Sequence, residues 1–392
     1  MSPDPRPTFL VSRTDAIGDV VLTLPVCGRL KQLRPGCRVV LIGRAYTAPV
    51  AAACPWVDDF LNLDDLLKLP EAAQVAALRA YAAAAIVHVF PNPALARLAQ
   101  KARIPVRIGT RSRWQHWLSC NRLVALSRRH SPLHETQLNL KLLQPLGGAP
   151  ETALADAAAL VRLRPAQPLP APLQLLLRQR EPGQLNVILH PRSRGSAREW
   201  GSAHFGQLAR LLHQAGHRVF VTGTAAEGEE LADWRQQHAP FLAADLTGQL
   251  SLPQFLAFIA AADGLVAGST GPLHLAAALG RHALGLYPPI RPMHPGRWGP
   301  LGPHAEYLVF DKPDCADCRA QPAACACIRA IEPLAVAARV LAWSRCPAKN
   351  NCPLVANKWE FARLGSSVDV VAQPTPRCNP YIGQRKAGRS YF

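Results

Sequence analysis

The stretch AGSTGPLHLAAALG, residues 267–280, predicts a strand, a tight turn and a helix in immediate succession. The strand ends in small residues, and Pro272 follows at a first helical position, where its missing N–H leaves no hydrogen bond unmade. The free N–H groups of Thr270 and Gly271 lie at the positive end of the helix dipole and would bind a phosphate. For this stretch taken alone, an ordinary helix with a Ser/Thr cap is the alternative.

Short apolar strands alternate with amphipathic helices in both halves of the chain. The first predicted helix lies near Val20–Leu33, and Pro25 predicts a kink or a restart inside it. This alternation favours an α/β fold with two Rossmann-like domains that face each other across a cleft. Ligands of such folds bind at the carboxyl ends of the strands. The predicted strands are Phe9–Ser12, Arg38–Ile42, Ala85–Phe90, Asn186–Pro191, Arg218–Gly223 and Gly264–Gly268.

Four segments are expected along the chain. Residues 1–165 and 185–343 would each form one Rossmann-like domain. A Pro- and Leu-rich linker, 166–184, would join them. The basic segment 344–392 has no sustained periodicity, so we expect a disordered tail.

The charge of the chain narrows the class of partner. The 392 residues include 44 Lys or Arg against 26 Asp or Glu, a formal net charge of +18. Such a charge favours nucleic acid, a membrane surface or a phosphorylated substrate. The sequence shows no signal-peptide pattern and no apolar run long enough to span a bilayer. A cytoplasmic protein is expected, one that could rest on a membrane face.

The loop HPRSRGSAREW, residues 190–200, concentrates cationic and hydroxyl side chains after a predicted strand. The guanidiniums of Arg192 and Arg198 could grip phosphates in a bidentate fork, and the Ser193 hydroxyl could add a neutral donor. A solvated basic loop is the alternative. Glu227 could accept hydrogen bonds from ribose hydroxyls, or could be a first-turn acid favoured by the helix dipole.

The stretch RTDAIGDV, residues 13–20, follows the first predicted strand. Asp19 would lie at the first turn of a helix at the rim of the cleft, with Arg13 beside it. A carboxylate there could take the proton of an attacking hydroxyl. It could also serve only as a helix cap, worth on the order of 1 kcal/mol. Asp15 is the competing carboxylate and is more typical of a loop acid.

Several motifs together resemble the heptosyltransferases of lipopolysaccharide core assembly, glycosyltransferase family 9. The resemblance covers roughly residues 8–343 and implies a GT-B fold, with an N-terminal acceptor domain, a C-terminal nucleotide-sugar domain and a final helix that crosses back. It also implies an inverting, metal-independent transfer from ADP-L-glycero-β-D-manno-heptose. The motifs are RTDAIGDVVLTLP, HETQLNLKLLQPLG (134–147), HPRSRGSAREW, residues 246–280 and PGRWGPLG (295–302).

The resemblance assigns roles to individual residues. Asp19 matches the family's proposed catalytic base, and Arg13 matches the basic residue near it. One departure concerns Ser269, because the family commonly has Asp at this position, where it is thought to touch the sugar. A transferase of another nucleotide sugar in cell-envelope polysaccharide synthesis, or a catalytically weak binding homologue, therefore stays open. The donor-binding residues would be Arg192, Ser193, Arg198, Glu227, Ser269, Thr270, Gly271 and His274.

A basic segment with aromatic residues suits an anionic acceptor. Residues 97–141 hold ten Lys or Arg against one acid, Glu135, with Trp114 and Trp117 among them. Lipid A with Kdo, at the anionic cytoplasmic face of the inner membrane, would match this charge. Nucleic acid and a merely solvated face are the alternatives, and no nucleic-acid-binding motif accompanies the charge. The expected acceptor-binding residues are Arg111, Arg113 and Arg122.

The cysteines of CADCRAQPAACAC, residues 315–327, leave two interpretations open. Their spacing could hold zinc tetrahedrally, or they could be free or loosely paired thiols. We favour the thiols, and we expect no catalytic metal and no cofactor beyond the nucleotide-sugar donor. The cysteines concerned are Cys315, Cys318, Cys325 and Cys327.

Overall fold

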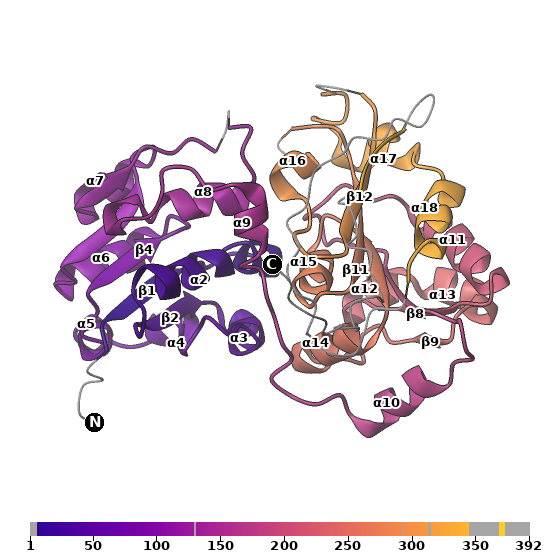
Figure 1. The fold of residues 1–392 in the computed structure, drawn as a ribbon, viewed down its shortest axis with the longest axis horizontal. Helices are drawn as coiled ribbons and strands as arrows, with labels where there is room; N and C mark the ends of the chain where they lie inside the picture. The colour runs from indigo at the N-terminus through magenta and orange to yellow at the C-terminus, as the bar shows by residue number, and fades with distance from the viewer. Residues whose placement is uncertain (1–5, 129–130, 292, 313–314, 345–367, 373–392) are drawn as a thin grey trace, which may run out of the picture.

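Two lobes lie side by side, each built around one sheet flanked by helices (Figure 1). The first lobe is drawn in indigo to magenta and the second mainly in orange. This arrangement confirms the predicted α/β fold with two Rossmann-like domains. The computed structural model describes residues 6–128, 131–291, 293–312, 315–344 and 368–372.

The first sheet is parallel throughout and has the strand order β3-β2-β1-β4-β5-β6. β1 lies at its centre, and all five of its residues are buried, as expected for an apolar strand covered on both faces. The strands are β1 (Thr8–Ser12), β2 (Arg38–Gly43), β3 (Asp59–Asn62), β4 (Ala85–His88), β5 (Val106–Thr110) and β6 (Arg122–Val124).

The predicted first helix is two helices. The first ends at Val21 and the second restarts at Leu24 with Pro25 in its first turn, which confirms the restart predicted at this proline. The helices of this lobe are α1 (Ile17–Val21), α2 (Leu24–Leu33), α3 (Ala48–Ala52), α4 (Leu63–Leu66), α5 (Glu71–Ala80), α6 (Pro93–Lys101), α7 (Trp114–Ser119), α8 (Glu135–Lys141) and α9 (Leu154–Ala158).

The second sheet has the strand order β13-β12-β11-β10-β7-β8-β9. Its strands are parallel except for β13, which pairs antiparallel with β12. The strands are β7 (Asn186–His190), β8 (Arg218–Val221), β9 (Ala244–Asp245), β10 (Gly264–Gly268), β11 (His282–Tyr287), β12 (Ala305–Phe310) and β13 (Val368–Ala372).

The last helix before residue 344 packs on α11 within the second lobe. The family resemblance had implied a final helix that crosses back to the first lobe, but this helix stays in the second lobe. The segment 166–184 holds a helix, α10. The helices of this part are α10 (Ala171–Arg178), α11 (Ser202–Gln214), α12 (Ala225–Glu230), α13 (Ala232–His238), α14 (Leu252–Ala261), α15 (Gly271–Ala278), α16 (Pro295–Trp298), α17 (Ala326–Arg329) and α18 (Pro333–Leu341).

Five residues of the tail that we expect to be disordered form a strand. Residues 368–372, sequence VDVVA, form β13 along the edge of β12, because β-branched residues favour a strand and β12 offers unpaired backbone groups there. The expectation of disorder for residues 344–392 stays a prediction. The rest of the tail, 345–367 and 373–392, lies outside the described residues.

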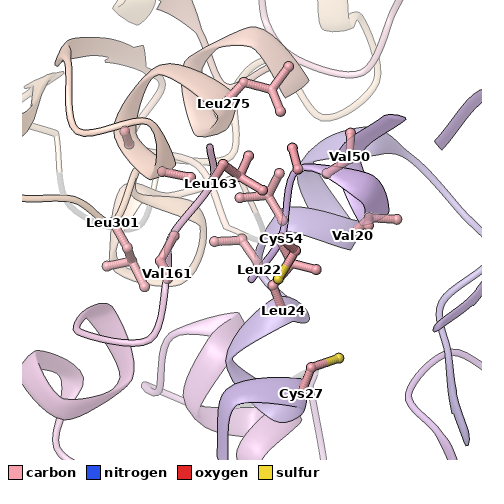
Figure 2. Packing of buried hydrophobic residues seen from close by; sticks show 14 of the residues in the cluster. Val20, Leu22, Leu24, Cys27, Val50, Cys54, Val161, Leu163, Leu275 and Leu301 are labelled. Carbon is pink, nitrogen blue, oxygen red and sulfur yellow. The ribbon is translucent and has the colours of Figure 1, made fainter. Parts of the chain in front are cut away.

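A single apolar core continues from one lobe into the other. The chain that leaves the first lobe is fixed to both: Leu163 N donates to Ala278 O at 2.9 Å, and Arg164 N donates to Ala53 O at 2.8 Å. Figure 2 shows Leu163 between Leu275 of the second lobe and Leu22 of the first. Because burial of apolar surface favours contact, the two lobes are held together along this seam.

The turn after β1 meets the turn after β10 at this seam. Gly18 in α1 lies so close to α15 that an added Cβ would be 2.9 Å from His274 Cδ2 and 3.7 Å from Gly271 Cα. A Cβ added at Gly271 would lie 3.1 Å from Ile17 Cβ. Two glycines therefore permit the first turns of α1 and α15 to touch. The turns after β1 and β10 therefore come together across the seam.

We expect Gly18→Ala to separate α1 from α15. The added methyl group meets a buried imidazole, and overpacking of this kind costs about 1–3 kcal/mol of unfolding free energy. The measurement is urea-induced unfolding. Gly268→Ala is the matched control, since its Cβ would lie an ordinary 3.5 Å from its nearest neighbour, Arg198 O. Equal stability of the two variants would contradict the close packing.

Candidate active site

Asp19 projects from the first turn of α1 and forms an ion pair with Arg13. Arg13, which follows β1, is 3% exposed, and its Nε also donates to Asp15 at 2.6 Å. The N-cap of α1 is Ala16, with no side-chain capping bond. The Asp19 carboxylate therefore does not cap the helix; it binds the arginine beside it and stays 20% exposed.

The surroundings of Asp19 change its acidity. Burial raises the pKa of Asp19 to about 6, although the positive charge of Arg13 lowers it; the negative charges of Asp15 and Glu135 add to the rise. A carboxylate with such a pKa is ionised near neutral pH and is a stronger base than an ordinary aspartate. Its environment thus suits it to accept a proton.

Glu135 is a buried carboxylate, 1% exposed, that holds three arginines. Its Oε1 accepts from Arg128 Nε at 2.9 Å and from Arg13 at 3.4 Å, and its Oε2 accepts from Arg297 at 3.0 Å. Burial alone would raise the pKa of Glu135, but these three guanidiniums outweigh it, and the pKa lies below its usual value. The Glu135 carboxylate is therefore held in its ionised form beside Asp19 and Arg13.

This network crosses between the lobes. Glu135 belongs to α8 of the first lobe and Arg297 to α16 of the second. The neighbouring residue His134 adds a bond across the same seam: its Nε2 lies 2.9 Å from Gly299 O, while its Nδ1 accepts from the N–H of Thr136. Burial lowers the pKa of His134 to about 4, so it bridges the lobes as a neutral ring. The geometry around Asp19 thus depends on the docking of the lobes.

Facing α1, the first turn of α15 presents two buried polar atoms without a partner among the described residues. They are Thr270 Oγ1 and His274 Nδ1. Burial lowers the pKa of His274 to about 3, so its ring is neutral. Because a buried polar atom without a hydrogen bond is costly, two such atoms at the positive end of a helix indicate a place for an anionic ligand.

The loop 190–200 is also held internally. Arg192 forms ion pairs with Glu199 and Glu230, and Glu199 also accepts from the N–H and the hydroxyl of Ser193 at 3.0 Å. Arg192 Nε is buried without a partner among the described residues. A phosphate that binds this loop therefore has to compete with two carboxylates.

Arg198 and Glu227 are likewise engaged within the protein. Arg198 is buried, and its guanidinium donates to the sulfur of Cys318 at 3.4 Å and to the Cys318 carbonyl at 3.3 Å. Glu227 forms a capping box with Thr224 at the start of α12, so the first-turn alternative describes its contacts here. Ser269 makes a side-chain hydrogen bond with Tyr287. Burial raises the pKa of Tyr287, and this hydrogen bond opposes the rise.

The three arginines expected to bind the acceptor flank α7 in the sequence and take no part in the ion pairs of Glu135. Arg111 and Arg113 follow the carboxyl end of β5, and Arg122 begins β6. All three are exposed. They line the side of the first lobe around α7.

The four clustered cysteines are buried and free. Cys315 Sγ lies 3.6 Å from Cys327 Sγ, and Cys318 and Cys325 interact through their side chains. In the ranges that the structure describes, no three His, Cys, Asp or Glu side chains are grouped to hold a metal ion. No helix in those ranges is long and apolar enough to cross a bilayer.

Sequence reasoning missed Glu135, Arg128 and Arg297 as parts of one site. Glu135 and Arg297 fall in the motifs 134–147 and 295–302, yet no spacing rule connects residues 162 positions apart. The one available signal was that Glu135 is the only acid in a strongly basic segment. A lone acid among many bases is a candidate for a shared ion-pair partner.

Comparison with known proteins decides the family. The model of glycosyltransferase family 9 (heptosyltransferase) matches residues 73–328. The chain belongs to glycosyltransferase family 9. It is a glycosyltransferase, and its two-sheet architecture is the GT-B fold.

Several relatives are similar to this glycosyltransferase. It is 26% identical over 324 residues to the "Putative glycosyltransferase" of Haemophilus influenzae. The aligned region covers 78% of this chain and 89% of that relative. It is 32% identical over 101 residues to the lipopolysaccharide heptosyltransferase 2 of Escherichia coli. This aligned region covers 25% of this chain and 29% of that enzyme. The structure of E. coli ADP-heptose lipopolysaccharide heptosyltransferase II superposes with a TM-score of 0.67 at 18% identity, over 85% of this chain and 97% of the other.

We expect Glu135→Gln to destabilise this glycosyltransferase strongly. The amide cannot neutralise the three guanidiniums that share this buried position, and removal of one partner from a buried ion pair costs about 3–5 kcal/mol. The measurement is the unfolding free energy from urea titration.

Glu71→Gln is the matched control for this prediction. Glu71 is 65% exposed and pairs with the exposed Lys101, so its loss should cost about 0–1 kcal/mol. Similar losses in the two variants would show that the Glu135 network adds no special stability.

Proposed function

We propose that this enzyme transfers L-glycero-D-manno-heptose from ADP-heptose to Kdo or heptose on lipid A, in the inner core of lipopolysaccharide. One observation carries the proposal. Thr270 Oγ1 and His274 Nδ1 are buried with no hydrogen-bond partner in the described part of the chain, and they face, across the seam, the helix that bears Asp19. An anion site thus opposes a base, as a transfer with a diphosphate leaving group requires.

In the proposed reaction Asp19 removes the proton of the acceptor hydroxyl. The acceptor oxygen forms its bond to the anomeric carbon from the face opposite ADP, and the bond from that carbon to the phosphate oxygen breaks. The electron pair leaves with ADP, and the configuration of the sugar inverts. Arg13 holds the Asp19 carboxylate in place and balances its charge.

Negative charge grows on the ADP leaving group, and residues of the second lobe would stabilise it. The N-terminus of the eight-residue helix α15 supplies its dipole and the N–H of Gly271, while Thr270 and His274 supply their unpaired side-chain atoms. We propose that Arg192, Ser193 and Arg198 contact the diphosphate after exchanging their present partners, Glu199, Glu230 and Cys318. These groups account for the stabilisation without a metal ion.

The donor assignment rests on relatives as well as on the site. The matched relatives of Salmonella typhimurium and Escherichia coli are lipopolysaccharide heptosyltransferases. A solved structure of the same fold was determined with ADP-2-deoxy-2-fluoro heptose, although at 19% identity it speaks for the fold alone. Ser269, where the family commonly has Asp, favours the second candidate, a transferase of another nucleotide sugar.

We keep three earlier expectations as parts of the proposal. The first lobe, residues 1–165, binds the acceptor, with Arg111, Arg113 and Arg122 in contact with its anionic groups. The second lobe, residues 185–343, binds the donor, with Glu227 and Ser269 at the ribose and the sugar. The enzyme works at the cytoplasmic face of the inner membrane and takes no cofactor besides its donor.

The test is acceptor-dependent ADP release from ADP-heptose, with Kdo-bearing lipid A as acceptor and UDP- and GDP-sugars as competing donors. Of these donors, we expect only ADP-heptose to be turned over in the presence of the acceptor. We expect this turnover to persist when EDTA is added. Asp19→Asn should lower kcat by 100-fold or more, because a general base typically contributes about 10²–10⁴-fold. ADP-heptose binding should survive in this variant.

Asp15→Asn is the matched control, since Asp15 contacts the same arginine but is not the proposed base. It should retain turnover. Turnover of a UDP- or GDP-sugar instead of ADP-heptose would establish the second candidate. An active Asp19→Asn enzyme would remove Asp19 as the base.

The pH dependence follows from the pKa of Asp19. Since only the ionised carboxylate accepts a proton, kcat/KM should fall about tenfold per pH unit below about 6 and level off above it. Arg13→Gln removes the attractive charge, so the pKa of Asp19 and the acid limb should move to higher pH. Asp15→Asn removes a repulsive charge and should move them to lower pH. An acid limb that neither variant moves would contradict the assignment.

A further inference from the structure

Helix α7 presents an unusually apolar face to solvent. Trp114 is 68% exposed, Trp117 62% and Leu118 69%. At 100° per residue these three side chains fall on one side of the helix, and the buried His116 and Ser119 fall on the other. The described part of the chain has other exposed large apolar side chains, but α7 gathers three of them within five residues.

This face is held rigidly outward. On the buried side, His116 Nδ1 accepts from Thr110 N at 2.8 Å, and α7 packs on α6 and β5. The indole N–H of Trp117 donates to Arg111 O at 2.8 Å, so its only hydrogen-bond donor is already satisfied. The ring can therefore enter an apolar environment without leaving a polar group unpaired.

Exposed arginines flank α7 in the sequence. Residues 72–134 contain no Asp or Glu. The exposed Arg111 and Arg113 directly precede α7, and Arg122 follows it. None of the three forms an ion pair with another described residue. Exposed Trp and Leu on a helix flanked by exposed arginines match the boundary between anionic headgroups and acyl chains.

The position of α7 relates it to the candidate active site. The strand order β1-β4-β5-β6 places the carboxyl ends of β1 and β5 two strands apart on one sheet edge, about 10 Å at the usual strand spacing. Arg13 follows β1 and Arg111 follows β5. Between them, after β4, lies the exposed ring of Phe90, beside the Arg13 guanidinium at 5.7 Å from the ring centroid. One sheet edge thus leads from the base to α7.

We propose that α7 docks on an anionic phospholipid surface, with Trp114, Trp117 and Leu118 in the interface. The flanking Arg111, Arg113 and Arg122 then lie at the level of the headgroups, where they meet the anionic groups of the phospholipids and of a lipid-linked acceptor alike. The docking sets the sheet edge that bears Asp19 close to the membrane. A lipid-linked acceptor then reaches the base without leaving the bilayer; this last use rests on the proposed function, whereas the docking itself does not.

The test is flotation of the full chain with vesicles of phosphatidylcholine alone and of phosphatidylcholine with phosphatidylglycerol. We expect binding to the anionic vesicles, weakened by salt, and roughly tenfold weaker binding by the triple variant Trp114→Ser, Trp117→Ser, Leu118→Ser. Arg111→Gln combined with Arg113→Gln should weaken binding to the vesicles that contain phosphatidylglycerol. The same variant should leave any binding to vesicles of phosphatidylcholine alone unchanged.

The matched control is Leu334→Ser combined with Leu341→Ser. These leucines are 65% and 48% exposed on α18 of the second lobe, so the control removes exposed apolar area away from α7. It should bind vesicles like the unaltered protein. Equal losses in the control and the triple variant would overturn the assignment to α7, as would unchanged binding by the triple variant.

Two further readouts separate this proposal from its alternatives. Binding to a single-stranded oligonucleotide that depends on α7, without binding to anionic vesicles, would overturn the proposal in favour of nucleic acid. With a water-soluble acceptor that lacks acyl chains, the triple variant should turn over like the unaltered enzyme and lose rate only on lipid-linked acceptor. Failure of ADP-heptose turnover in both proteins would refute the proposed function and leave the vesicle result standing.

Discussion

Three guanidiniums around one buried carboxylate set the geometry of this enzyme. Without Glu135, the charges of Arg13, Arg128 and Arg297 would face one another in a poorly solvated seam, which costs several kcal/mol per ion. With it, Arg13 is held where it also binds Asp19, and Arg297 draws the second lobe onto the first. The same network therefore positions the proposed base and docks the two domains.

The tight seam has a second requirement, which is backbone proximity. Gly18 and Gly271 allow α1 and α15 to touch, and the core continues across the contact through Leu163. This places a carboxylate with a raised pKa opposite a helix N-terminus that carries two unpaired polar atoms. Each lobe alone holds only half of such a site, so its chemistry depends on the interface.

Much of this site was predictable because the strand–turn–helix pattern is local. A buried strand that ends in RTDAIGDV or in AGSTGP delivers its next residues to the carboxyl edge of a sheet, whatever the rest of the chain does. The sequence predicted that Arg192, Arg198 and Glu227 follow strands of the second domain. It did not predict which side chains they contact. Their present partners, Glu199, Cys318 and Thr224, include residues whose proximity no pattern encodes.

The sequence by itself determined the α/β class, the restart at Pro25, the candidate base and the candidate phosphate-binding turn, because each depends on residues within one turn of each other. Only the tertiary structure decided that Glu135 is shared by three arginines, that Ile17 and Gly18 meet Gly271 and His274, and that Trp114, Trp117 and Leu118 stay outside the core. The reason is physical: the pairing of distant charges and the exposure of apolar side chains depend on how the elements pack, and local patterns do not record that packing.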